Sequence, residues 1–233
     1  MSPKKLALIA GSVALLLIAA LGGVYLGTRL GGSPGPGQAA VSAGPTGSPT
    51  TAAAAGVCGP RTTTTEPGTV TEPPPAQWEE LAAKDATALG PLVVPRTTVG
   101  GPFPATDGST IPKCFAPNPT GALTAGYYMW AMTDARLPLE TRKAFLEATV
   151  AQDDEGRDEY IQTTLNSPVR IHITGIRLSA PVANNTAVVE VALEYQGRRI
   201  IAHSPMYWSG DTWVTGTYTE TAPVEGPLFR WAP

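Results

Sequence analysis

Charged residues are scarce in this sequence, and basic residues do not outnumber acidic ones. Lys, Arg, Asp and Glu together make up 15% of the 233 residues, well below the roughly 25% typical of soluble domains. The formal net charge is -3, so the chain lacks the surplus of positive charge that holds proteins on phosphate backbones. We therefore expect no direct binding to nucleic acid.

Residues that commonly carry catalysis are also few. The chain has two histidines, His172 and His203, and it has no nucleophile elbow, glycine-rich phosphate loop or metal-spaced His/Cys cluster. His172 alternates with apolar neighbours, which places it on the solvent face of a strand, while the facing of His203 stays open. Asp134 and Asp158 could serve as carboxylate partners, but nothing in the sequence fixes their geometry. We predict a non-enzymatic protein with no catalytic, cofactor-binding or metal site.

One long hydrophobic run lies at the N-terminus. Residues 6–26 carry no charge, and a helix of that length, at about 1.5 Å per residue, spans the roughly 30 Å core of a bilayer. Two lysines precede the run and one arginine follows it, which favours a cytoplasmic N-terminus. We predict a cytoplasmic segment 1–5, a transmembrane helix 6–30, and a single-pass protein of the cell membrane whose C-terminal domain lies outside the cytoplasm.

A cleaved signal peptide is the alternative interpretation of this run. The hydrophobic region of a signal peptide usually holds about 7–15 residues, which is shorter than the run seen here. Small residues near the end of the run nevertheless fit a cleavage site, namely Ala19, Ala20, Gly22 and Gly23. Both interpretations place the rest of the chain outside the cytoplasm.

Residues 31–77 lack most of what a folded core needs. The segment contains nine prolines, three charged residues and no aromatic residue. Such a composition cannot bury enough apolar surface to offset the entropy lost on ordering. We predict a disordered Pro/Gly/Thr/Ala linker that spaces the domain from the membrane.

Cysteine occurs only twice, at Cys58 and Cys114. Outside the cytoplasm, an even pair is most simply a structural disulfide. A metal site would need further ligands, and a redox motif would need closer spacing. The expected disulfide would pin the end of the linker and the irregular segment 78–113 onto the domain.

Residues 78–220 have the patterns of a globular domain, with 221–233 as a C-terminal tail. We expect a short helix at 78–83 and irregular structure over 90–118. Three helices and then four strands with period-two alternation follow. The expected helices run from Pro119 or Thr120 to 134, over 139–150 and over 157–165, and the expected strands cover 169–178, 186–195, 198–208 and 212–218.

The order of these elements predicts an α+β domain, in which helices pack on one face of a curved four-stranded antiparallel sheet. Pro205 cannot donate a ladder hydrogen bond, which predicts a bulge or an edge position. The acidic residues 153–155 are expected to complement the dipole of the third helix rather than to hold a metal. Five aromatic residues could line a binding cone between sheet and helices, although such residues more often form core. They are Tyr127, Tyr128, Trp130, Tyr207 and Trp213.

Helices followed by a meander that closes on the turn 207–213 (YWSGDTW) resemble the nuclear transport factor 2-like or cystatin-like superfold. Together with the N-terminal anchor, this layout is similar to the single-pass assembly factors of type IV secretion and to the TcpC group of conjugation-channel proteins. The segment 114–123 (CFAPNPTGAL) also resembles a motif of actinobacterial conjugative-element proteins. The long proline-rich linker departs from the usual layout of these assembly factors.

The resemblance implies a non-enzymatic, membrane-anchored assembly subunit of a conjugation or type IV secretion-like DNA-transfer apparatus. Its partners would be other secretion-channel proteins, and self-association would make it a homo-oligomer. The alternative is an extracytoplasmic ligand- or lipid-binding accessory domain associated with a transporter. A filled interior between helices and sheet, together with an exposed apolar outer face, would favour assembly, whereas an open apolar cone would favour the accessory domain.

Overall fold

The computed structural model describes residues 56–59, 64–81, 91–167, 169–195, 198–217, 220–222 and 228–231. These residues belong to one compact unit, Ala53–Pro233. None of the helices that they form is both long enough and apolar enough to cross a membrane. The predicted cytoplasmic segment 1–5 and transmembrane helix 6–30 lie outside the described residues.

The main sheet is an antiparallel meander, as the sequence predicts. Strands β3 to β6 are neighbours in chain order. The predicted strand over 212–218 is shorter than expected, because β6 ends at Thr215. A further strand that was not predicted, β7, pairs with residues 201–203 of β5. The bounds are β3 His172–Leu178, β4 Thr186–Tyr195, β5 Arg198–Trp208, β6 Trp213–Thr215 and β7 Glu220–Ala222.

Pro205 does not lie at a bulge, which corrects one of the two expectations, but it does occupy a local edge position of β5. The register between β4 and β5 runs without a break through the pair Val188 and Pro205, and the register shift of this sheet falls in β3 instead, between Ile173 and Gly175. On the other side of β5, β6 pairs up to Met206 and β7 pairs with residues 201–203. Pro205 therefore occupies the gap between two partner strands, where its missing N–H removes no ladder bond from either.

A second, two-stranded sheet precedes the first helix. β1 (Gln77–Leu81) pairs antiparallel with β2 (Leu92–Arg96). The expected helix at 78–83 is therefore wrong for residues 78–81, while residues 82–83 lie outside the described part. Trp78 of β1 packs edge-to-face on Tyr127 and Trp231, with ring centroids 6.0 and 6.1 Å away. These contacts come from distant parts of the chain, and such tertiary packing commonly overrides local helix preference.

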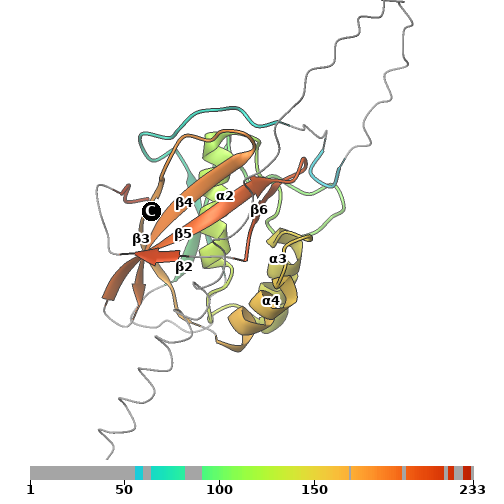
Figure 1. Ribbon diagram of the computed structural model, residues 1–233. Helices are drawn as coiled ribbons and strands as arrows, with labels where there is room; N and C mark the ends of the chain where they lie inside the picture. The colour runs from blue at the N-terminus through green and yellow to red at the C-terminus, as the bar shows by residue number, and fades with distance from the viewer. Residues whose placement is uncertain are drawn as a thin grey trace, which may run out of the picture. The chain divides into compact units, whose positions relative to one another are not determined.

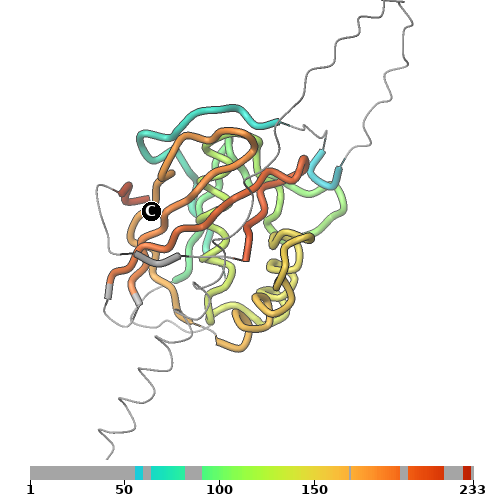
Figure 2. The backbone as a smooth tube through the Cα atoms, in the orientation of Figure 1, coloured from blue at the N-terminus to red at the C-terminus, as the bar shows by residue number. Residues whose placement is uncertain are grey.

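The described residues 64–77 run along the domain, although the whole of 31–77 was expected to be a disordered linker. The backbone N–H of Glu66 donates to the carbonyl of Pro117 at 2.7 Å. Gly68 and Val182 exchange two backbone hydrogen bonds of 3.2 and 2.6 Å. Figure 2 shows this segment following one end of the sheet. The linker expectation is therefore corrected for these residues, and its first part, 31–55, lies outside the described residues.

The central element of the domain is α2 (Pro119–Ala131). The side chain of Asn118 caps its start by accepting a hydrogen bond from the N–H of Gly121 at 2.7 Å. The helix is buried along most of its length because the main sheet covers one side and β2 contacts it as well (Figure 1). Gly126 permits the close approach to the sheet, since a Cβ there would lie 2.6 Å from Cγ1 of Val189 in β4.

The other two helices, α3 (Leu139–Thr149) and α4 (Arg157–Asn166), pack against each other. Phe145 and Leu146 provide the fully buried part of α3, which contacts the main sheet at β6. Three helices were expected on one face of the sheet. Of these, α2 packs on the sheet, α3 contacts it at β6, and α4 packs on α3.

Helix α3 also buries a cation. Arg142 is 7% exposed, and among the described residues neither Nε nor Nη1 of its guanidinium has a hydrogen-bond partner. Burial of a charge without compensation is unfavourable. We expect Arg142→Met to keep the packing of the side chain, remove this cost, and raise the free energy of unfolding by on the order of 1 kcal/mol or more. In thermal unfolding, each kcal/mol gained in the free energy of unfolding should raise Tm by about 2–4 °C.

Lys143 provides the matched control for this prediction. It is the next residue of α3, but its side chain is exposed and lies 3.9 Å from Glu147. We expect Lys143→Met to change stability by less than about 0.5 kcal/mol, as is usual for surface positions. A lower Tm for Arg142→Met than for the unaltered protein would contradict the prediction.

The C-terminal segment completes the domain, so the predicted tail 221–233 is shorter than expected. Phe229 and Ile176 exchange two backbone hydrogen bonds of 2.9 and 3.0 Å along β3. The indole N–H of Trp231 donates to the carbonyl of Pro74 at 3.1 Å, and the ring is buried against Trp78. The C-terminal segment is therefore joined to the segment that leads into β1.

Candidate functional site

The four candidate acid–base residues do not form a common site. His172 is exposed, as the alternation predicts, and its Nδ1 lies 3.4 Å from Oε2 of Glu194. His203 is partly buried, and its Nδ1 lies 3.5 Å from Oε1 of Glu190. Asp158 is an exposed residue of α4.

Asp134 is buried but has a structural role. Its carboxylate pairs with Arg136 at 2.8 Å, and both side chains are almost fully buried. It also accepts a hydrogen bond from the N–H of Ile171 at 2.7 Å, which ties the end of α2 to the start of β3. Burial by itself raises the pKa of Asp134, but the hydrogen bonds from Arg136 and Ile171 outweigh that effect and leave the pKa below its usual value. The carboxylate is therefore a permanently charged structural group at neutral pH.

A charged row crosses three strands of the main sheet. Glu190 of β4 stands opposite Arg177 of β3 and His203 of β5. Its carboxylate pairs with the guanidinium of Arg177 and lies beside the imidazole of His203. Cross-strand pairs of this kind stabilise a sheet, so this row holds three strands in register.

Four of the five aromatic residues that could have lined a cone are buried or partly buried. Tyr127, Tyr128 and Trp213 are buried. Burial raises the pKa of both tyrosines, which keeps their phenols neutral. Trp130 is partly buried, and its indole N–H donates to Oγ of Ser204 at 3.0 Å. Tyr207 differs from the other four because it is 44% exposed.

Tyr207 contributes to an open cleft of about 880 Å³ beside the disulfide. Four parts of the chain line it: the two disulfide-bearing segments, the end of α3 with the loop that follows it, and the hairpin between β5 and β6. The lining residues are Val57, Cys58, Lys113, Ala148, Val150, Ala151, Gln152, Asp153, Asp154, Tyr207, Trp208, Ser209, Asp211, Thr212 and Val214.

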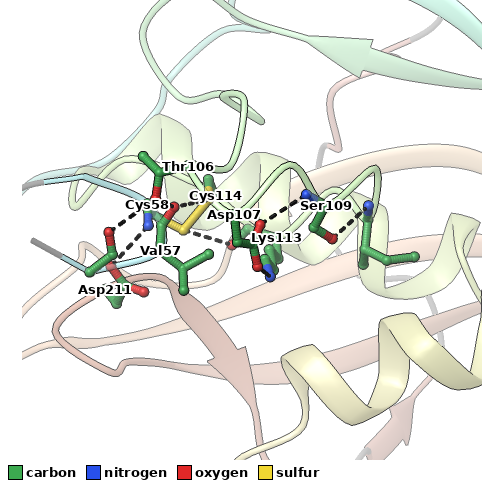
Figure 3. Close-up of polar contacts among 10 residues, drawn as sticks. Val57, Cys58, Thr106, Asp107, Ser109, Lys113, Cys114 and Asp211 are labelled. Carbon is green, nitrogen blue, oxygen red and sulfur yellow. Dashed lines mark hydrogen bonds and ion pairs between the residues drawn. A yellow bond between two sulfur atoms is a disulfide. The ribbon is translucent and has the colours of Figure 1, made fainter.

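The Cys58–Cys114 disulfide predicted from the sequence is present and fixes one wall of this cleft. Its two Cα atoms lie 5.2 Å apart. The backbone N–H of Cys58 donates to Oδ1 of Asp211 at 3.3 Å, and the carbonyl of Val57 accepts a hydrogen bond from the N–H of Thr106 at 2.8 Å (Figure 3). The disulfide therefore holds segment 56–59 to the segment around Cys114, and the hydrogen bond to Asp211 holds it to the β5–β6 hairpin.

The α3–α4 loop, another wall of the cleft, is held by Asp154, an acidic residue that was expected to complement the dipole of the third helix. Asp154 accepts two hydrogen bonds from Thr217, at 2.7 Å from its N–H and at 3.0 Å from its hydroxyl. The residue at the N-cap of α4 is Gly156, which has a left-handed backbone with φ of 82° and offers no side-chain cap. The expectation that residues 153–155 complement the α4 dipole is thus corrected for Asp154, which anchors the loop beside β6.

In the part of the chain that the structure describes, no group of three or more His, Cys, Asp or Glu residues could hold a metal ion. The cleft instead combines an apolar floor, which includes Val150, Trp208 and Val214, with charged groups at its rim. Trp208 is held by edge-to-face packing on Trp213, with ring centroids 5.7 Å apart. Such a surface suits binding by contact and charge.

The fold and the cleft together define a disulfide-bonded α+β domain with an open binding surface. The chain belongs to the family described as "Domain of unknown function (DUF8175)", whose model matches residues 39–225. No curated protein and no solved structure matches this sequence.

Proposed function

We propose that this protein is a non-enzymatic, membrane-anchored assembly subunit of a conjugation or type IV secretion-like DNA-transfer apparatus. Residues 6–30 anchor it in the membrane and residues before Gly56 span the distance to the domain. The domain contacts other secretion-channel proteins and further copies of itself. The nuclear transport factor 2-like topology belongs to this proposal, and it is supported by helices that precede an antiparallel meander.

The observation that carries the proposal is the disulfide between Cys58 and Cys114. Disulfides persist in compartments outside the reducing cytoplasm. This agrees with the uncharged run at residues 6–26, which would leave the domain outside the cell membrane. The close packing of α2 on β4 at Gly126 and Val189 further supports assembly, because a carrier of lipid needs an internal cavity.

A ligand-binding accessory domain associated with a transporter is the second candidate. The open cleft of about 880 Å³ favours it, since that volume lies within the range of small-molecule sites. The two candidates predict different companions in the cell: channel subunits and a transfer ATPase in one case, transporter subunits in the other.

The test is in-cell lysine crosslinking of the full chain, followed by purification from membranes and mass spectrometry. The affinity tag belongs at the N-terminus, because Trp231 near the other end is buried and a C-terminal tag would disturb it. We expect recovery of the protein itself together with channel subunits, and a large fall in DNA-transfer frequency when its gene is deleted. Recovery of transporter subunits, with unchanged transfer in the deletion strain, would move the accessory domain to first place.

A further inference from the structure

The cleft beside the disulfide carries more negative than positive charge. Three carboxylates line it, on Asp153, Asp154 and Asp211, against the single ammonium group of Lys113. Lys113 already pairs with Asp107 at 2.7 Å, and Asp107 does not line the cleft. The hydrogen bonds that Asp154 and Asp211 accept come from backbone N–H groups and a hydroxyl, so none of these bonds is an ion pair.

Asp153 is the carboxylate that remains available. It is exposed, and in the described part of the chain it has no ion pair and its side chain makes no hydrogen bond. An incoming cation would therefore gain its interaction without displacing an existing partner. The full negative charge of the cleft is open to a ligand from solvent.

An aromatic ring stands beside this negative charge. A Cβ at Gly216 would lie 3.1 Å from Oδ2 of Asp154 and 3.2 Å from Cε2 of Tyr207, so the carboxylate and the ring flank the same spot. Tyr207 is 44% exposed. An ammonium or guanidinium group beside an exposed aromatic ring and a carboxylate is attracted in two ways, through the ring quadrupole and through charge.

From this geometry we propose that the cleft binds an extended segment of a partner protein through a lysine or arginine side chain. The cationic head lies among Asp153, Asp154 and Tyr207, and the aliphatic stem and neighbouring residues rest on Trp208 and Val214, which line the cleft and are partly exposed. The proposal rests on the assembly function above and names the chemistry of the partner. Anionic lipid headgroups and nucleic acid would be repelled by the same carboxylates.

The disulfide gives this surface a fixed shape. Because Val57 and Cys58 form one wall and are covalently held to Cys114, the cleft does not have to be ordered when a partner binds. Preorganisation of this kind lowers the entropic cost of association.

The experiment is site-specific photo-crosslinking in the intact cell with the full chain. Gln152 lines the cleft and is exposed, so Gln152→p-benzoylphenylalanine places the reactive group there without altering the proposed contacts. Val99 is 57% exposed and does not line the cleft, so Val99→p-benzoylphenylalanine is the matched control. Crosslinked peptides are then sequenced by mass spectrometry.

We expect the peptide captured at position 152 to carry Lys or Arg within a few residues of the attachment point. Asp153→Lys should reduce the yield of this peptide at least fivefold, and Tyr207→Ala should reduce it about two- to fivefold. Asp153→Glu keeps the charge and should give the same yield as Asp153. None of the three variants should change capture at position 99. Both altered side chains are exposed, and an unchanged Tm of each variant confirms that the fold is intact. Four outcomes would each overturn the proposal. They are capture of peptides without basic residues, lipid adducts, no adduct at position 152, and a yield that Asp153→Lys does not change.

The outcomes also separate this inference from the proposed function. A basic segment of a transporter subunit at position 152 would support the cleft chemistry and contradict the DNA-transfer role. Channel subunits recovered by lysine crosslinking, with no basic segment at position 152, would support the DNA-transfer role and overturn the cleft proposal.

Discussion

Removal of the Cys58–Cys114 disulfide is expected to lower the free energy of unfolding by about 4 kcal/mol. The two cysteines are separated by 56 positions, and closing a loop of that length restricts the unfolded chain by about this amount in the chain-entropy model. The variant should be Cys58→Ala together with Cys114→Ala, because Cys114 is 1% exposed and a buried hydroxyl would add a separate cost. Urea unfolding of residues 53–233 measures the effect, since this segment is one compact unit.

Reduction of the unaltered protein provides the control for this experiment. With a phosphine reductant, its unfolding midpoint should move to that of the double variant, because both treatments remove the same covalent link. The double variant itself should not respond to the reductant. A loss below about 1 kcal/mol would mean that the loop contributes little entropy to the unfolded state, and it would contradict the expected constraint on segment 56–59.

The regular elements of the domain could be predicted because their signals are local. Pro119 and Asn118 mark the start of α2 through a fixed backbone angle and a capping side chain. The strands β4 and β5 follow from alternation and from the short turn between them. The disulfide followed from the count of two cysteines. None of these inferences needed knowledge of a distant contact.

The errors concern residues whose structure depends on distant partners. Trp78 starts a segment with helical composition, but it packs on Trp231 at the far end of the chain. Gly68 lies in a proline-rich stretch without periodicity, yet two hydrogen bonds hold it to Val182. Pairings between such separated residues leave no local pattern, and a sequence without aligned relatives does not show them.

The cleft was recognisable only in part for the same reason. The turn 207–213 is distinctive in the sequence, but nothing in it indicates that Val57 and Cys58 lie opposite. Asp153 and Asp154 have the pattern of a solvated helix start, whereas Asp154 bonds to Thr217, 63 positions away. The exposed Tyr207 could not be distinguished from the buried Tyr127 by residue type alone.

The second large effect is expected at Asp134. The substitution Asp134→Asn removes the charge that compensates Arg136, whose side chain is 3% exposed. Leaving one partner of a buried ion pair without its counter-charge typically costs about 3–5 kcal/mol. Urea unfolding of residues 53–233 should show this loss. Asp158→Asn is the matched control, because that carboxylate is 94% exposed and its removal should change stability by less than about 0.5 kcal/mol.

The same carboxylate contributes to stability in a pH-dependent manner. Its pKa in the folded protein lies below the value in the unfolded chain, which is about 3.9. Folding therefore favours the ionised form, and the contribution is fully present above the unfolded pKa and is lost as the pH falls through the folded pKa. Between pH 7 and pH 2, the unaltered protein should lose more stability than Asp134→Asn, so the difference between them should shrink on acidification. A difference that stays constant over this range would show that the shape of the Asp134 side chain, and not its charge, holds α2 to β3.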